Sequence, residues 1–261
     1  MANWTETTVN VGGTDVALVR GGSGKPLFML HDELGFPGWV TWNEALAEEH
    51  EFLIPLQPGC GKTPRVDWIR TYRDLGGFYA RMIREMNLGP IDAIAFSAGG
   101  YAAAEMAAAD PAMFERLILV APMGIKPEEG EIADIFPLTI RTHMRATVAD
   151  INTPEFGDIY GGEMTPDQFE AFEDARAEAA RIGWEPYMHN PSLPHLLEGA
   201  KGVSALLVRG SADAIVPKGC IDSYKKVIDH AQVATIQGVG HRPEIENSAE
   251  FIRIVRDYLA S

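Results

Sequence analysis

The chain has 261 residues, of which 46% are hydrophobic and 23% are charged, a balance typical of a globular protein with a large core. Its formal net charge of -15 opposes contact with nucleic acid, and its two cysteines, Cys60 and Cys220, exclude a disulfide-rich scaffold and a cysteine-rich metal site. The first residues lack a secretory signal, and no uncharged apolar stretch is long enough to span a bilayer. We therefore expect a cytoplasmic protein with no nucleic-acid partner and no membrane association.

In chain order, short apolar runs alternate with amphipathic stretches. The first two predicted strands are joined by a turn at Gly12 and Gly13, and the third is apolar throughout, as expected of a strand covered on both faces. Strands that alternate with helices predict βαβ crossovers and a mostly parallel sheet, and therefore an α/β fold. The predicted strands are 5–11, 14–20, 26–30, 51–56, 91–96, 115–122, 203–210 and 231–237, and the predicted helices are 40–50, 71–88, 98–109, 218–228 and 248–260.

The alternation stops between residues 125 and 201, where no strand is predicted. We interpret 125–201 as a helical lid inserted after the sixth strand into a core formed by 1–124 and 202–261. A separate small domain is the alternative, but the pattern on both sides needs both halves of the core to complete one sheet.

Two helices are predicted within this lid. One covers 165–184 and begins with a capping box, in which Thr165 is the N-cap, Pro166 lies in the first turn and Gln168 occupies the third position. The other lies within 138–150, where apolar residues recur at helical spacing.

The stretch "AFSAGG" places Ser97 between a predicted buried strand and a predicted Ala-rich helix. A nucleophilic serine at such a sharp turn takes a strained backbone conformation and needs small residues two positions before and after it. Ala95 and Gly99 meet this requirement. We therefore predict that Ser97 is a catalytic nucleophile on a nucleophile elbow, and a helix N-cap serine is the alternative.

Two further residues could complete a catalytic triad with Ser97. A nucleophilic serine requires a general base, and the base requires a carboxylate that holds its tautomer and stabilises its cation. Asp213 follows the strand at 203–210, and His241 follows the last strand. All three residues then lie beyond the carboxyl ends of parallel strands, where open α/β sheets form their sites. Ordinary loop roles for Asp213 and His241 are the alternative.

The loop "HDELG" after the third strand is a candidate for part of an oxyanion hole. A developing oxyanion needs backbone N–H donors from two places. We assign one donor to Ala98, directly after the nucleophile, and the other to Glu33, with His31 organising the loop. An acidic pair beside a forming oxyanion is unfavourable unless the side chains of Asp32 and Glu33 point away from it.

An apolar substrate pocket is expected between the end of the sixth strand and the lid, although plain packing is the alternative for each of its residues. No histidine shows the spacing of a metal site, so we expect neither a metal nor a cofactor. The candidate pocket residues are His31, Met123, His143, Met144, Phe169 and Trp184.

Together these motifs resemble the α/β-hydrolase superfamily, specifically its lidded, esterase-like serine hydrolases. The elbow "AFSAGG", the acid loop "RGSADAIVP", the histidine loop "GVGHRPEIE", the oxyanion loop "LHDELG" and the turn "PGCGKT" are each similar to the family's motifs. Ala95 replaces the usual glycine of the elbow, and Asp32 replaces the glycine after His31. The resemblance covers nearly the whole chain and implies an eight-stranded, mostly parallel sheet with flanking helices and a helical lid after strand 6.

The resemblance implies hydrolysis of a small carboxylic ester through an acyl-enzyme. Two other enzyme classes resemble this architecture and share its triad: carbon–carbon bond hydrolases of aromatic breakdown and cofactor-free haloperoxidases that make peracids. The same fold also serves as a receptor scaffold, which is the alternative outside enzymes. The sequence leaves the acyl chain, the leaving group and the oligomeric state open.

The charge of the predicted lid leads to an expectation about the substrate. Residues 126–186 hold 14 acids and 5 bases, so we expect an approaching anion to be repelled and neutral, short to medium acyl esters to be preferred. Carbon–carbon hydrolases act on dianions and would need basic residues, for which Arg141, Arg145 and Lys62 are the candidates. An ordinary histidine titrates near pH 6.5, so the acid limb of kcat/KM is expected around neutrality.

Overall fold

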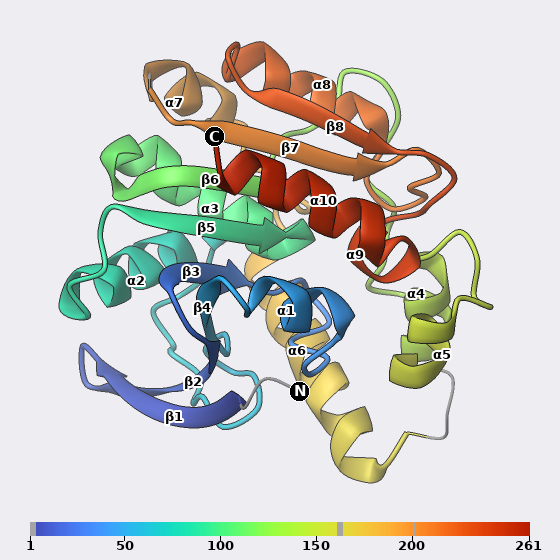
Figure 1. Cartoon of the computed structure of the whole chain (residues 1–261), viewed down its shortest axis with the longest axis horizontal. Coiled ribbons are helices and arrows are strands. Elements are labelled where there is room, and N and C mark those ends of the chain that lie inside the picture. Colours follow the sequence, from blue (N-terminus) through green and yellow to red (C-terminus); the bar gives the residue numbers. More distant parts are fainter. Residues whose placement is uncertain (1–3, 161–163, 201) are drawn as a thin grey trace.

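The computed structural model describes residues 4–160, 164–200 and 202–261. Its centre is an eight-stranded sheet (Figure 1). The strands are β1 (Trp4–Val11), β2 (Thr14–Gly22), β3 (Lys25–Leu30), β4 (His50–Pro55), β5 (Ile91–Phe96), β6 (Phe114–Val120), β7 (Ala205–Gly210) and β8 (Gln232–Ile236). They lie in the order β1-β2-β4-β3-β5-β6-β7-β8, and every neighbouring pair from β4 to β8 is parallel. The predicted α/β class with a mostly parallel eight-stranded sheet is confirmed.

Helices cover both faces of this sheet, so the central strands are buried on both sides. β5 shows the consequence, because all six of its residues are buried. Ala93 and Ala95 face one apolar core, and Ile94 and Phe96 face the other. The first core packs against α2 (Tyr72–Glu85), α3 (Ser97–Ala109) and α8 (Lys218–Val227), and the second against α1 (Thr41–Leu46) and α10 (Ser248–Leu259) (Figure 1).

The segment between β6 and β7 contains helices and, among its described residues, no strand. Three of the helices gather at the carboxyl edge of the sheet (Figure 1) and form an apolar cluster of their own with Leu34 and Ile245. The predicted capping box of Thr165 and Gln168 is present. The helices of the segment are α4 (Ile140–Ala146), α5 (Pro154–Tyr160), α6 (Pro166–Gly183) and α7 (Leu193–Gly199).

Helix α7 differs from the other three because it packs with the core. Its buried residues Leu193 and Leu197 belong to the cluster that contains α3 and α8. The structure thus places α7 beside the sheet, although its residues fall within 125–201. Among the described residues, no helix combines the length and apolarity that crossing a membrane requires.

Candidate active site

The turn from β5 into α3 carries Ser97. Its φ of 47° lies in the left-handed region that side chains other than glycine rarely adopt, which is the strain that a nucleophile elbow imposes. A Cβ at Gly99 would lie 2.3 Å from the backbone oxygen of His31, and a Cβ at Gly100 would lie 2.9 Å from the Cβ of Pro122. Close packing therefore requires glycine at both positions that follow the elbow.

Asp213 and His241 meet beyond the carboxyl ends of β7 and β8. His241 Nδ1 lies 2.9 Å from Asp213 Oδ2, while Asp213 Oδ1 accepts hydrogen bonds from the backbone N–H groups of Ile215 and Val216 at 2.8 and 2.9 Å. A Cβ at Gly210 would lie 1.9 Å from the oxygen of Gly240, so a glycine at the end of β7 lets the two loops approach. The carboxylate is thus fixed on one side and holds the imidazole on the other.

Ser97 Oγ and His241 Nε2 are both buried and have no hydrogen-bond partner among the described residues. These are the two atoms that a serine triad would join. Ser97 is 2% exposed and His241 is 3% exposed, so a substrate could reach them only if a covering segment moved.

The loop after β3 runs beside this turn, because β3 and β5 are paired in parallel up to Leu30 and Ala95. His31 Nε2 accepts the N–H of Gln57 at 3.1 Å, so its Nδ1 carries the proton that is donated to the oxygen of Asp32 at 2.8 Å. Both ring nitrogens of His31 are used within the loop. The imidazole therefore holds the loop in shape and is not available as a base.

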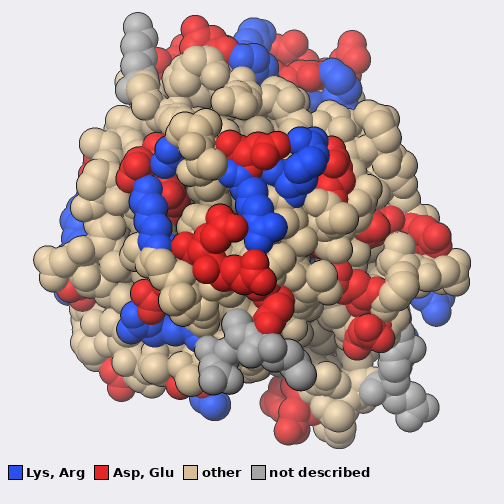
Figure 2. Space-filling model, viewed as in Figure 1, with Lys and Arg blue, Asp and Glu red and all other residues tan. Residues whose placement is uncertain are grey.

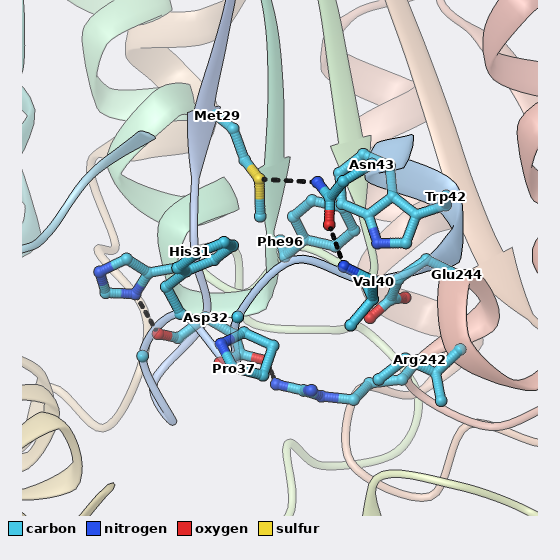
Figure 3. A pocket seen from close by; sticks show the side chains of 14 residues that line it. Met29, His31, Asp32, Pro37, Val40, Trp42, Asn43, Phe96, Arg242 and Glu244 are labelled. Atoms are coloured by element: carbon cyan, nitrogen blue, oxygen red, sulfur yellow. Dashed lines mark hydrogen bonds and ion pairs between the residues drawn. The ribbon is translucent and has the colours of Figure 1, made fainter. Parts of the chain in front are cut away.

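Asp32 forms a buried ion pair with Arg242, the residue after His241 (Figure 3). Arg242 also donates to the hydroxyl of Tyr160 at the end of α5. A cavity of about 20 Å³, room for one water molecule, lies beside Asp32 and Arg242, and Ser97 is not among the residues that line it. The pair joins the candidate oxyanion loop, the histidine loop and the helical segment.

Glu33 forms a second buried pair with a residue of the helical segment. Its Oε1 lies 3.2 Å from Nε2 of His143 on α4, and both side chains are fully buried. Burial alone would raise the pKa of Glu33, but the hydrogen bond and charge of His143 and the charge of His241 hold it well below its usual range. Glu33 is therefore an ionised carboxylate close to the candidate triad, directed at His143.

The charges around His241 determine its protonation. Burial would lower its pKa, but the charge and hydrogen bond of Asp213, together with the charges of Glu33 and Asp32, raise it to about 9. A base must be neutral to accept a proton, and His241 is neutral only above this pKa. We therefore expect the acid limb of kcat/KM at alkaline pH, and not near neutrality as the sequence alone indicated.

We expect kcat/KM for a neutral ester to rise through an acid limb centred near pH 9, because His241 is protonated below its pKa of about 9. The measurement is kcat/KM between about pH 6 and pH 10, corrected for spontaneous hydrolysis. Glu33→Gln should move the limb to lower pH because it removes a negative charge close to His241, whereas Glu105→Gln, a change at a buried carboxylate of α3, should leave it in place. A wild-type limb near pH 6.5 would contradict this electrostatic account.

Of the other candidate pocket residues, two are buried and two are exposed. Met123 donates its backbone N–H to the oxygen of Ser97 at 3.2 Å and is fully buried, and Met144 is buried in the cluster of the helical segment. Phe169 is 48% exposed and Trp184 is 60% exposed, so we leave these two out of the proposed pocket. Ala98 is buried at the start of α3.

Sequence reasoning missed the partners of the acidic loop. The sequence patterns indicate His143 only as a pocket residue and give no role to Arg242 or Tyr160. The one local signal was the pair Asp32–Glu33 in an otherwise apolar stretch, since buried acids need partners. The partners themselves lie 110 and 210 residues away in the sequence, beyond the reach of any local pattern.

The chain is similar to known hydrolases in sequence and in fold. The sequence model described as "Alpha/beta hydrolase family" matches residues 27–254. A 2-hydroxymuconate semialdehyde hydrolase of Pseudomonas sp. strain CF600 is 24% identical, with 92% of this chain and 88% of the relative covered. A 2-hydroxy-6-oxo-2,4-heptadienoate hydrolase of Pseudomonas putida strain F1 is 22% identical over 97% of this chain and 95% of the relative. The structure of the meta-cleavage product hydrolase of Pseudomonas fluorescens IP01 is similar in fold, with a TM-score of 0.78, 17% identity and 97% of both chains covered.

Proposed function

Because the chain belongs to the alpha/beta hydrolase family, we propose that it is a serine hydrolase with Ser97 as nucleophile, His241 as general base and Asp213 as the carboxylate that orients His241. One observation carries the proposal: Asp213 holds Nδ1 of His241 at 2.9 Å, and Nε2 has no partner among the described residues, at the same edge of the sheet as the strained turn of Ser97. A hydrolase-fold receptor has no need of this arrangement.

In the proposed reaction, Ser97 Oγ attacks a carbonyl carbon while His241 Nε2 takes its proton. The backbone N–H groups of Ala98 and Glu33 stabilise the oxyanion. His241 then gives the proton to the leaving group, and an acyl-enzyme remains on Ser97. Water, deprotonated by His241, attacks the acyl carbon; the bond to Ser97 Oγ breaks, His241 returns the proton to Oγ, and the acid is released. Each step uses side chains and backbone groups of this chain alone.

Entry to the site would require a lid, and helices α4, α5 and α6 are the proposed one. They lie at the carboxyl edge of the sheet, and Leu34 and Ile245, next to the oxyanion loop and the histidine loop, complete their apolar cluster. Because α7 packs with the core, the proposed lid is shorter than 125–201.

Neutral acyl esters are the substrate class that the charges of the site favour. The acids of the helical segment support this less than their number suggests. Among the described ones only Glu178 is buried, and the others are exposed or half-buried, so salt screens them. Figure 2 shows how acidic side chains lie at the surface of the face that it draws. Glu33 provides the stronger reason, because it is an ionised, fully buried carboxylate close to the triad. A substrate carboxylate would face it at short range in a medium of low dielectric constant.

Hydrolysis of a carbon–carbon bond is the second candidate, and the comparisons favour it over ester cleavage. Two of the relatives, at 24% and 22% identity, are hydrolases of this kind, whereas a third, 24% identical, is a pyrrolizixenacetamide deacetylase of Xenorhabdus hominickii. The substrates of the first two, by name, carry acidic groups. The basic residues considered for binding such groups, Arg141, Arg145 and Lys62, are all exposed, and Lys62 pairs with Glu6 at 2.6 Å.

We expect kcat/KM for a neutral alkyl ester to exceed that for its hemisuccinate analogue by at least about tenfold, because the carboxylate of the analogue would be unpaired near Glu33. One preparation of the protein is assayed at low and at high salt with both esters, a vinylogous keto acid and a perhydrolysis reaction. A preference that persists at high salt supports the buried charge of Glu33, since only exposed charges are strongly screened. Faster turnover of the vinylogous keto acid than of any ester would show that the function is carbon–carbon bond hydrolysis and not ester cleavage.

A further inference from the structure

Three buried polar side chains beside the candidate triad leave one atom each without a partner. Glu33 Oε2, His143 Nδ1 and the Tyr72 hydroxyl have no hydrogen-bond partner among the described residues. All three side chains are buried. We call Glu33, Tyr72 and His143 the buried polar cluster; they come from the loop after β3, the first turn of α2 and α4.

The cluster lies next to the first turn of α3, which begins with Ser97. Glu33 and His143 are joined at 3.2 Å. The ring of Tyr72 stacks on that of Tyr101, one helical turn after Ser97, with 4.6 Å between the ring centres. Burial, and then the charge of Glu33, raise the pKa of Tyr72 well above its usual range, so its hydroxyl keeps its proton. The cluster and the triad thus share one buried region.

Unpaired polar atoms in such a region are costly and are rarely retained without a use, because buried polar groups are normally hydrogen-bonded. Of the two oxygens of Glu33, Oε1 already accepts from His143, and Oε2 has no donor in the part of the chain that the structure describes. An apolar substrate would leave Oε2 unpaired, and an anionic one would add repulsion. A substrate with its own O–H or N–H group would satisfy it.

We propose that Glu33 is a specificity-determining residue, whose Oε2 accepts a hydrogen bond from an uncharged donor, a hydroxyl or an amide N–H, carried by the substrate near the carbonyl that Ser97 attacks. This inference rests on the proposed serine-hydrolase function and adds the substrate class: small acyl compounds that carry a donor group. His143 keeps the carboxylate ionised and oriented, and Tyr72 offers a hydroxyl to the same substrate group. Sites of this kind discriminate strongly against analogues that lack the donor, because the buried acceptor is then left unpaired.

The test compares substrates that differ only by hydroxyl and methyl. Methyl 3-hydroxybutanoate is paired with methyl 3-methylbutanoate, and methyl 2-hydroxybutanoate with methyl 2-methylbutanoate. For at least one pair we expect kcat/KM to favour the hydroxyl ester by about 10- to 100-fold. The ratio within a pair is independent of the protonation of His241, because both substrates meet the same enzyme.

Glu33→Gln should reduce this ratio to within about threefold while the variant still turns over the methyl-branched ester. The matched control is Glu105→Gln, since Glu105 is also a buried carboxylate that accepts from one side chain, Asn190, at 2.7 Å. Its ratio should equal that of the wild type. An unchanged ratio in Glu33→Gln, or a reduced ratio in the control, would overturn the assignment to Glu33.

A binding measurement separates this inference from the proposed function. In Ser97→Ala, calorimetry should show tighter binding of 3-hydroxybutanamide than of 3-methylbutanamide, or the same preference in the 2-substituted pair, and Glu33→Gln added to Ser97→Ala should remove it. If the wild type hydrolyses esters but neither pair shows a preference, the inference is wrong and the proposed function stands. If no ester is hydrolysed, the proposed function fails, and equal binding within both amide pairs contradicts the inference as well.

Discussion

Ser97→Ala is expected to lower kcat for ester hydrolysis by on the order of 10⁶-fold, the loss typical of removing a serine nucleophile. The reason is that no acyl-enzyme can form without Oγ, and the remaining oxyanion donors stabilise only the attack of water. The fold should be kept, because alanine fits the turn at a φ of 47° no worse than serine does. The measurement is kcat at an alkaline pH, with thermal unfolding as the check of the fold.

Ser204→Ala is the matched control, since the hydroxyl of Ser204 lies 2.9 Å from that of Tyr258, away from the site. It should keep nearly full activity. Activity of Ser97→Ala within about tenfold of the wild type would mean that another residue is the nucleophile.

Asp213→Asn is expected to lower kcat by roughly 10⁴-fold without unfolding the protein. The amide oxygen can still accept from the N–H groups of Ile215 and Val216, which turns the amide NH₂ toward His241. Nδ1 of His241 must then accept, its proton moves to Nε2, and the imidazole can no longer take the proton of Ser97. The measurement is kcat across the alkaline range, compared with the wild type.

Asp222→Asn provides a control at an exposed carboxylate that pairs with Lys218 at 2.6 Å, and it should leave kcat unchanged. A loss of less than about tenfold in Asp213→Asn would show that a different acid orients His241.

The sequence was sufficient to predict the elements that local rules determine. The strand before Ser97 was predicted at 91–96 and is found there, because a fully buried central strand is apolar along its whole length. Helix α6 begins where the capping box indicates. The helix predicted at 40–50 is shorter, since α1 ends at Leu46 and β4 begins at His50.

The site was predictable only in part, for a physical reason. The turn around Ser97 depends on neighbours in sequence, so small residues indicate it. The pairing of Glu33 with His143 depends on how α4 packs against the loop after β3, and no local pattern encodes that contact. The pKa of His241 follows from three carboxylates that the fold brings together, so its alkaline value could not be read from residue types.

The net charge of the helical segment is a second feature whose effect the sequence alone did not predict. Counting 14 acids and 5 bases over 126–186 predicted repulsion of anions, but nearly all the described acids are at the surface. The carboxylate that matters, Glu33, lies outside that segment. A count of charges gives their sum, whereas their effect on a buried substrate depends on where each is placed.

The most direct test of the central claim is to trap the nucleophile. The wild-type protein is treated with a fluorophosphonate probe at alkaline pH, and the adduct is located by mass spectrometry of its peptides. The serine-hydrolase account predicts one adduct, on Ser97, that is absent from Ser97→Ala and strongly reduced in Asp213→Asn. A stoichiometric adduct on any other residue, or no adduct under conditions in which esters are hydrolysed, would contradict it.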